Sequence, residues 1–142
     1  MECEFATINS NKDEIKSIFQ NTKTIAVIGC SPDPSKASNK VAKYLKNAGF
    51  TIFPVYPKED EILGEKVYRH LSDIPFKVDM VDIFRKPEVI DKIVDESIKR
   101  GDINTIWTQL GLVNNDAANK ALKAGMNVVQ NNCTKIEHEA LF

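Results

Sequence analysis

The chain has 142 residues, of which 42% are hydrophobic and 27% are charged, which suits one globular core and leaves little room for a second domain. Nineteen basic residues nearly balance twenty acidic ones, and the formal net charge of -1 disfavours binding to nucleic acid or to an anionic membrane. No apolar run reaches about 18 residues, so no membrane-spanning helix is expected. We therefore expect a single domain over residues 1–142.

The amino-terminal residues are acidic and lack the basic and then apolar pattern of a signal peptide. The three cysteines, Cys3, Cys30 and Cys133, are odd in number and widely spaced, which argues against a disulfide framework. Both features predict a protein of a reducing compartment, and we expect a cytoplasmic location.

The first predicted helix covers residues 11–21. Ser10 and Asp13 have the spacing of a capping box, and the apolar face consists of Ile15, Ile18 and Phe19. Residues 24–28 follow as a strand that is β-branched and apolar on both faces, which is typical of the middle of a parallel sheet. Gly29 ends this strand.

A loop over residues 30–37 leads to a second helix, for which Ser38 is the expected N-cap. The second strand covers residues 51–55, and Pro54 removes a hydrogen-bond donor, so it should lie near the strand's end or at an interruption in pairing. The surface stretch that follows is predicted to hold a short extended piece near Val67 and Tyr68.

The remaining elements alternate as strand, helix, strand, helix, strand over residues 78–84, 87–100, 104–110, 115–123 and 127–130. The buried stripes of the two helices are predicted to be Val89, Ile90, Ile93, Val94 and Ile98, and then Ala117, Ala118, Ala121 and Leu122. The tail is expected to add one short helical turn. This rhythm predicts right-handed βαβ units in an α/β, Rossmann-like doubly wound fold, with a mainly parallel five-stranded sheet and three layers.

Parallel sheets bind ligands beyond the carboxyl ends of their strands, which here directs attention to the end of each strand. After the first strand, only the first glycine of a dinucleotide fingerprint is present. Even so, the loop leads into a helix start, whose free N–H groups suit a phosphate. Hydroxyl donors and one charge are available from Ser31, Ser35, Ser38 and Lys36. The alternative is a structural loop of proline turns with a serine cap.

The end of the second strand argues against NAD. Domains that bind NAD place a carboxylate there to hold the ribose hydroxyls, whereas this chain has Val55, Tyr56, Pro57 and Lys58. A lysine at this point suits a phosphorylated ribose, as found in NADP and in coenzyme A. Taken alone, Lys58 is better explained as a solvated surface residue.

Two further strand ends carry candidate ligand contacts. Arg85 and Lys86 follow the third strand, where they could contact a phosphate, form a lid, or begin a solvated helix. Gln109 and Gly111 follow the fourth strand and offer an amide and a point of close backbone approach. The simpler reading of that pair is a strand terminus.

An ordered set of residues resembles a known family. These residues are Gly29-Cys30-Ser31 with Pro34 and Ser38, Val41-Ala42-Lys43-Tyr44-Leu45, Gly49-Phe50, Pro54-Val55 with Pro57, Gly64-Glu65, Val78-Asp79, Val81-Asp82 to Phe84-Arg85, Trp107 with Gln109 and Gly111, and Cys133 with Lys135-Ile136-Glu137-His138. Together they resemble the small stand-alone CoA-binding domain proteins, which are similar to the N-terminal domain of the succinyl-CoA synthetase alpha subunit. The resemblance covers residues 22–138.

The resemblance implies a Rossmann-like fold and coenzyme A, or an acyl-CoA, as the ligand. By position it implies that the diphosphate meets Gly29, Ser31, Lys36 and Ser38. It also implies that the adenosine and its phosphate meet Val55, Tyr56, Pro57 and Lys58, and that Phe84 and Arg85 line the opposite wall. Cys30, Gln109 and Gly111 complete the predicted cofactor-binding set.

Two positions depart from the family pattern, and no reaction follows from it. Tyr56 stands where the family usually has asparagine, and it could stack on adenine or obstruct the ligand. Cys30 replaces a more usual aliphatic residue. The synthetase also needs a second domain with a phosphorylated histidine and a partner subunit, and this chain is too short to contain that domain.

Cysteine chemistry is the main argument for an enzyme. Cys133 and His138 could form a nucleophile with its base, or half of a zinc site with Cys3 or His70, but neither spacing is a recognised signature. A structural cysteine and a surface histidine explain the pair as well, so we predict no catalytic residues and no metal. Cys30 follows Gly29 at the anion loop, where a lowered thiol pKa is expected. A mixed disulfide between Cys30 and CoA is conceivable, although the thiol of CoA lies far from its phosphates.

The sequence therefore predicts a module that binds CoA or acyl-CoA without catalysis and acts as a sensor, carrier or regulator. The alternative is a small enzyme that depends on NADP or acyl-CoA. We expect no nucleic-acid or membrane partner, and the residues identify no protein partner.

Overall fold

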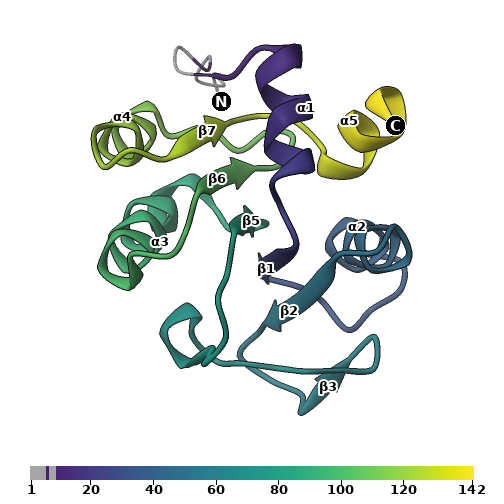
Figure 1. The fold of residues 1–142 in the computed structure, drawn as a ribbon. Helices are drawn as coiled ribbons and strands as arrows, with labels where there is room; N and C mark the ends of the chain where they lie inside the picture. The colour runs from purple at the N-terminus through teal and green to yellow at the C-terminus, as the bar shows by residue number, and fades with distance from the viewer. Residues whose placement is uncertain (1–5, 7–8) are drawn as a thin grey trace.

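The computed structural model describes Ala6 and residues 9–142. Its main sheet has five parallel strands in the order β2-β1-β5-β6-β7, as Figure 1 shows. The strands are β1 (Thr24–Ile28), β2 (Thr51–Val55), β5 (Met80–Ile83), β6 (Thr105–Thr108) and β7 (Asn127–Val129). The predicted Rossmann-like parallel sheet is confirmed. The direction of strand addition reverses between β1 and β5, which is where such sheets bind ligands.

Helices cover both faces of the sheet and make three layers (Figure 1). One face carries α1 (Lys12–Gln20), α2 (Ala37–Asn47) and α5 (Thr134–Leu141), and the other carries α3 (Pro87–Arg100) and α4 (Asn115–Lys123). The small strands β3 (Glu61–Ile62) and β4 (Glu65–Lys66) form a separate hairpin, and a 3₁₀ turn, η1, covers Leu71–Asp73. None of the helices in the described part of the chain is long and apolar enough to cross a membrane.

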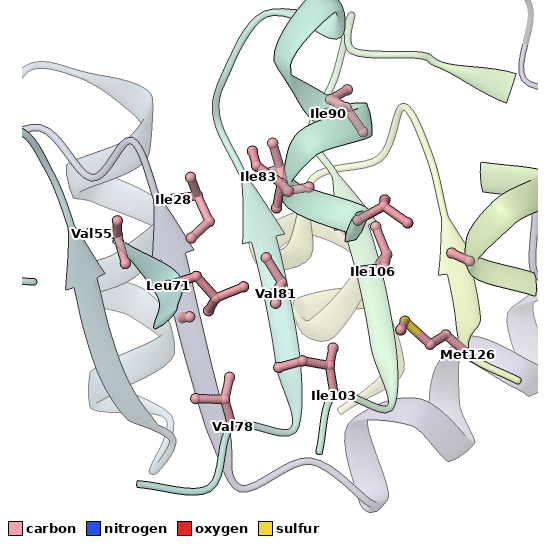
Figure 2. Packing of buried hydrophobic residues seen from close by; sticks show 14 of the residues in the cluster. Ile28, Val55, Leu71, Val78, Val81, Ile83, Ile90, Ile103, Ile106 and Met126 are labelled. Atoms are coloured by element: carbon pink, nitrogen blue, oxygen red, sulfur yellow. The ribbon is translucent and has the colours of Figure 1, made fainter. Parts of the chain in front are cut away.

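The core between the sheet and the α3/α4 layer is mainly aliphatic (Figure 2). The bounds of α3 and α4 agree with the prediction, but two of the residues predicted to be buried are exposed: Ile98 by 37% and Leu122 by 44%. On α3 the last buried residue is Ser97 instead of Ile98, and the Ser97 hydroxyl donates to the Ile93 carbonyl. A serine can occupy a buried helical position because the backbone satisfies its hydroxyl group.

The core on the other face is built around Trp107, which is fully buried on β6. Its ring lies 5.3 Å from the ring of Phe19 on α1, and its indole N–H donates to the Asn132 carbonyl at 2.8 Å. The buried tryptophan therefore has its one polar atom satisfied, and it links α1 to the segment before α5.

Two helix starts differ from the prediction. The N-cap of α1 is Asn11, one residue after Ser10, and it forms a capping box with Glu14. The N-cap of α2 is Lys36, which provides no side-chain capping hydrogen bond, while Ser38 lies inside the first turn. Ser38 is not a cap because its hydroxyl accepts a hydrogen bond from the Ser31 N–H instead.

At both edges of the sheet, residues outside the five strands form hydrogen bonds with the backbone of the chain at the outer strand. At the β2 edge, the Pro54 carbonyl accepts from the Tyr68 N–H, so the missing donor of this proline faces away from β1. Tyr68 forms a single bridge to β2 and does not extend the sheet as a strand. At the β7 edge, the Asn9 amide donates to the Gln130 carbonyl and accepts from the Gln130 N–H.

Candidate functional site

Gly29 lies where the ends of three strands converge. Its N–H donates to the Val55 carbonyl at the end of β2, and its φ of +86° is in the left-handed region. A Cβ at this position would lie 3.0 Å from the Phe84 carbonyl oxygen and 3.0 Å from Cδ of Arg85, both after β5. The residue is glycine because both the backbone angle and the close approach exclude a side chain.

Cys30 does not lie on the ligand-facing surface. The residue is 0% exposed and belongs to the apolar cluster beneath α2. Burial, and then the charge of Asp82, raise the pKa of its thiol to about 12. The predicted lowering of this pKa is therefore wrong, because the thiol points into the core and not toward the start of α2.

The loop between β1 and α2 is held by its own polar groups. The Ser31 N–H donates to the Ser38 hydroxyl, and the Asn39 side-chain amide donates to the Ser31 carbonyl, both at 2.9 Å. The Ser31 hydroxyl accepts from the Asp33 N–H. Because Ser31 and Ser38 act as acceptors in these bonds, each retains a hydroxyl hydrogen that could be donated to a ligand.

The first turn of α2 has features of an anion site and one feature that opposes it. The N-cap residue Lys36 is exposed and makes no side-chain capping hydrogen bond, so a positive charge stands beside the first N–H groups of the helix. Ser35, however, donates both its N–H and its hydroxyl to Asp33. The Ser35 hydroxyl is thus already used, and these hydrogen bonds lower the pKa of the Asp33 carboxyl.

Arg69 fixes the segment that follows β2. One guanidinium nitrogen of Arg69 donates to the carbonyls of Tyr56, Lys58 and Glu59 at 2.8–3.2 Å. Tyr56 is half-buried, whereas Pro57 and Lys58 are exposed. This clamp was missed from the sequence because Arg69 lies 10 to 13 residues after the residues it holds and carries no local pattern.

A cavity of about 190 Å³ opens between the ends of β1 and β2 and the α3 helix. Its apolar part is formed by Ile28, Val55, Leu71, Val89 and Ile93, and its polar part by Arg69, His70, Arg85, Lys92 and Glu96. Of the predicted site residues, the cavity includes Val55 and Arg85. Of the basic lining residues that were not predicted, only Lys92 had a sequence signal. It lies on α3 three residues after Val89, at the edge of the buried stripe.

Gln109 is buried and bound within the protein. Its side-chain amide donates to the Asp82 carboxylate and, at 3.1 Å, to the Thr134 hydroxyl at the start of α5. The Thr134 hydroxyl in turn donates to the second Asp82 oxygen at 2.9 Å. Gly111 is exposed, and its N–H donates to the Asn131 side chain. The Gln109 amide at the end of β6 is thus part of a buried polar network and is not exposed for contact with a ligand.

His138 belongs to an aromatic cluster between α5, α1 and α2. Its Nδ1 shares a hydrogen bond of 2.7 Å with the Tyr44 hydroxyl, and its ring lies within 5.5 Å of the rings of Phe19, Phe50 and Phe142. Burial lowers the pKa of this imidazole. Cys133 is the N-cap of α5. Cys3, the other residue considered for metal binding, lies outside the described residues.

The predicted site residues therefore fall into three groups. Gly29, Ser31, Lys36 and Ser38 surround the start of α2, and Val55 to Lys58 with Phe84 and Arg85 surround the neighbouring strand ends. Gln109 and Gly111 lie farther along the edge, toward β7. A parallel sheet with an uncapped helix start and basic residues at its switch point defines a nucleotide-binding class of α/β domain.

Comparison with known proteins specifies this class. The chain matches the CoA binding domain family over residues 23–139, and it belongs to that family. It is 38% identical over 130 residues to the uncharacterized protein YneT of Bacillus subtilis, covering 92% of this chain and 96% of that one. A solved structure of a hypothetical protein from Pyrococcus horikoshii OT3 superposes with a TM-score of 0.90 at 38% identity and covers 99% of both chains.

A larger enzyme subunit contains a similar region. The alpha subunit of the ADP-forming acetate–CoA ligase II of Pyrococcus furiosus is 30% identical over 128 residues. The match covers 83% of this chain but only 28% of that subunit. The similarity therefore concerns one region of the ligase subunit.

Proposed function

We propose that this protein binds coenzyme A or an acyl-CoA at the carboxyl edge of its sheet, without catalysis, as a sensor, carrier or regulatory module. The observation that carries the proposal is the uncapped start of α2, with its basic N-cap residue, at the switch point of a CoA-binding-family fold. Helix N–H groups and cations favour phosphate, and CoA presents a diphosphate and a ribose phosphate.

In this proposal the diphosphate lies against Gly29, Ser31, Lys36 and Ser38. The absence of a side chain at Gly29 lets the Phe84–Arg85 segment lie close to the end of β1, and the hydroxyls of Ser31 and Ser38 can donate to phosphate oxygens. Lys36 adds a positive charge at the helix start, where its attraction adds to the helix dipole.

The adenosine end lies against Val55 to Lys58, with Phe84 and Arg85 as the opposite wall. The nearby cavity of about 190 Å³ supports this orientation, because it combines an apolar floor with a basic rim. A purine ring needs apolar surface, and a ribose phosphate needs cations such as Lys58, Arg85 or Lys92. Arg69 holds the backbone of Tyr56 through its carbonyl, while the half-buried Tyr56 side chain packs against the apolar cluster on the α2 face of the sheet and not in this cavity.

Three residues that were predicted to contact the cofactor, Cys30, Gln109 and Gly111, have roles other than binding its phosphates or adenosine in this proposal. Cys30 supports the loop from below through packing, since its side chain has no exposed surface. Gln109 positions the β6–α4 segment through Asp82 and Thr134. Gly111 then offers its exposed backbone toward the pantetheine side of the ligand.

The engagement of His138 favours a binding role over cysteine catalysis. Its Nδ1 is bound to Tyr44, and its ring is enclosed by aromatic side chains, which makes it a poor base for Cys133.

Calorimetry with the purified ligand-free protein tests the proposal. We expect CoA to bind more tightly than dephospho-CoA, NADP and NAD, and Lys58→Ala to weaken CoA binding about 5- to 20-fold while leaving dephospho-CoA nearly unchanged. Lys123→Ala, in the last turn of α4, is the control and should not change the affinity. A preference for NADP would support the alternative, a small NADP-dependent enzyme, and absence of CoA binding would refute the proposal.

A further inference from the structure

Asp82 is a buried carboxylate that the proposed ligand contacts do not use. It is the third residue of β5, it is 0% exposed, and it accepts hydrogen bonds from Gln109 and Thr134. Burial raises the pKa of this carboxyl to about 7, while the two hydrogen bonds act in the opposite direction. A lone aspartate within an apolar strand is the sequence signal that could have identified it.

The surroundings of Asp82 provide little to stabilise its negative charge. Among the described residues, no lysine, arginine or histidine forms an ion pair with it. The titratable side chains of the same layer include Cys30 from the β1–α2 loop, Tyr56 after β2, Cys133 and His138 from α5, and Tyr44 from α2. Of these, only Cys30 is coupled to it electrostatically, and Cys30 is neutral at physiological pH.

Asp82 lies directly below the loop that would hold the anion. It is paired in register with Val27, two residues before Gly29, and the buried Cys30 side chain belongs to the same apolar cluster as Val27. Like charges repel strongly across a protein interior because the effective dielectric constant is low. A phosphate bound at this loop would therefore disfavour the ionised form of the carboxyl group.

We propose that Asp82 takes up one proton from solvent when an anionic nucleotide binds at the β1–α2 loop, so that affinity for CoA falls as the pH rises through neutrality. This inference rests on the proposed function, since it requires a phosphate-bearing ligand at that loop. The reaction balances as ionised protein plus ligand plus one proton, giving a complex in which Asp82 is a neutral acid. Linkage makes the effect reciprocal, because a ligand that favours the protonated form is itself favoured by protons.

The neutral acid also fits the hydrogen-bond network. The Asp82 oxygen that faces Thr134 can become the donor, and the Thr134 hydroxyl can rotate to accept while it still accepts from Gln109. The hydroxyl hydrogen of Thr134 then gives up its bond to Asp82. Proton uptake therefore requires no rearrangement of α5 or of the β6 end. Asp82 acts through electrostatics and makes no direct contact with the ligand.

Calorimetric titration of CoA in buffers with different ionisation enthalpies measures the proton uptake directly. For the wild-type protein, we expect uptake that increases from pH 6.5 to pH 8 and an affinity that falls by up to about fivefold between pH 7 and pH 8. Asp82→Asn should remove this uptake and flatten the pH profile. The ribose phosphate of CoA titrates near pH 6, so dephospho-CoA serves as a second ligand, with which the difference between wild type and variant should persist.

Asp79→Asn is the matched control. Asp79 is a buried aspartate just before the same strand, at the opposite edge of the sheet, where it accepts from the Lys23 and Thr24 N–H groups. This substitution should leave the uptake unchanged. As a measurement that needs no variant, carboxyl carbon NMR of aspartate-labelled wild-type protein should show the pKa of Asp82 rising when CoA is added.

The outcomes separate this inference from the proposed function. CoA binding with equal proton uptake in the wild type and Asp82→Asn, or with an unchanged pKa of Asp82, overturns the inference and leaves the binding function in place. Absence of CoA binding to the wild type at pH 6.5, where the site is most favourable, overturns both.

Discussion

Gly29 has no side chain, and this sets how closely the segments after β1 and β5 approach each other. A methyl group there would displace the Phe84 backbone, which cannot move as a flexible side chain can. The residue also has a left-handed φ, which disfavours any L side chain. Both costs arise at the start of the loop that would hold the proposed ligand.

We expect Gly29→Ala to lower the free energy of unfolding by about 2–4 kcal/mol and to abolish measurable CoA binding, because it combines backbone strain with a steric clash. Chemical denaturation and calorimetry measure the two effects. Gly125→Ala is the control, because Gly125 has a similar φ of +89° but open space around it. If both variants lose equal stability and both bind CoA, close approach at Gly29 is not required.

Arg69 allows the effect of charge to be separated from that of geometry. One terminal guanidinium nitrogen of Arg69 reaches all three carbonyls, and the ammonium of a lysine would not reach the same point because its side chain is one atom shorter. We expect Arg69→Lys to weaken CoA binding several-fold and to speed hydrogen exchange over residues 56–59. Calorimetry and exchange mass spectrometry give the two readouts. Wild-type affinity in Arg69→Lys would mean that the positive charge alone matters at this position.

At the scale of the elements, α5 is attached to the rest of the molecule by two different contacts. Thr134 joins its start to β5 through Asp82, and His138 joins its second turn to α2 through Tyr44. The sequence indicated only one short turn here, because the segment has a weak apolar pattern. The helix forms over eight residues because tertiary contacts stabilise it beyond its own propensity.

The docking of α5 should depend on pH through His138. Burial lowers the pKa of the folded-state imidazole, so the unfolded state binds more protons once the pH falls below about 6.5, the usual value for histidine. We expect the protection of α5 amides against hydrogen exchange to be constant from pH 8 to pH 7 and to decrease toward pH 5, after correction for intrinsic rates. His138→Phe keeps an aromatic ring and should lose this dependence. An identical decrease in that variant would assign the effect to another group.

Regular elements were predictable to the extent that local pattern defines them. The observed bounds of α3 and α4 agree with the predicted ones because both ends of each helix carry local signals. Helix α3 begins at a proline and ends in a basic turn before a glycine, and α4 begins after an asparagine cap and ends in a basic turn near a glycine. The start of α1 was placed one residue early because Ser10 and Asn11 are both suitable caps. The exposure of Ile98 and Leu122 could not be predicted, because the rotation of a helix on a sheet depends on the residues that it meets.

The candidate site was less predictable than the fold. The parallel topology indicated which strand ends could form the site. The basic and hydroxyl residues at those ends could be identified from the sequence. The burial of Cys30 and Gln109 was not found, because loop and strand-end side chains can turn toward the core or toward solvent with the same sequence pattern. The contribution of Arg69 and Lys92 depends on contacts across the fold, which no local spacing encodes.

At the scale of the whole molecule, Asp82 and His138 impose opposite pH dependences on stability. The folded-state pKa of Asp82 is raised to about 7 from its usual value near 4, so its contribution is greatest below pH 4 and is lost as the pH rises toward 7. The contribution of His138 is lost in the other direction, as the pH falls. The most stable pH should therefore lie on the acidic side of neutrality.

We expect Asp82→Asn to raise the melting temperature at pH 8 by about 5 °C or more relative to the wild type, and to leave it nearly unchanged or lower it at pH 4.5. The physical reason is that the amide retains much of the hydrogen bonding without a buried charge. Calorimetric unfolding at the two pH values measures the difference. A uniform decrease at both values would show that the ionised carboxylate stabilises the fold.

The contacts at the two outer strands have a consequence for how copies of this chain could associate. Beside β7, the Asn9 amide binds Gln130 as a peptide group of an adjacent strand would, and Ser10 occupies the Val128 carbonyl. Beside β2, the Tyr68 N–H donates to the Pro54 carbonyl, and Pro54 itself has no N–H donor. Another molecule therefore finds few free backbone groups at either side, so continuous sheets across molecules are disfavoured. Any assembly or aggregation from the folded state should instead involve the helical layers or the loops.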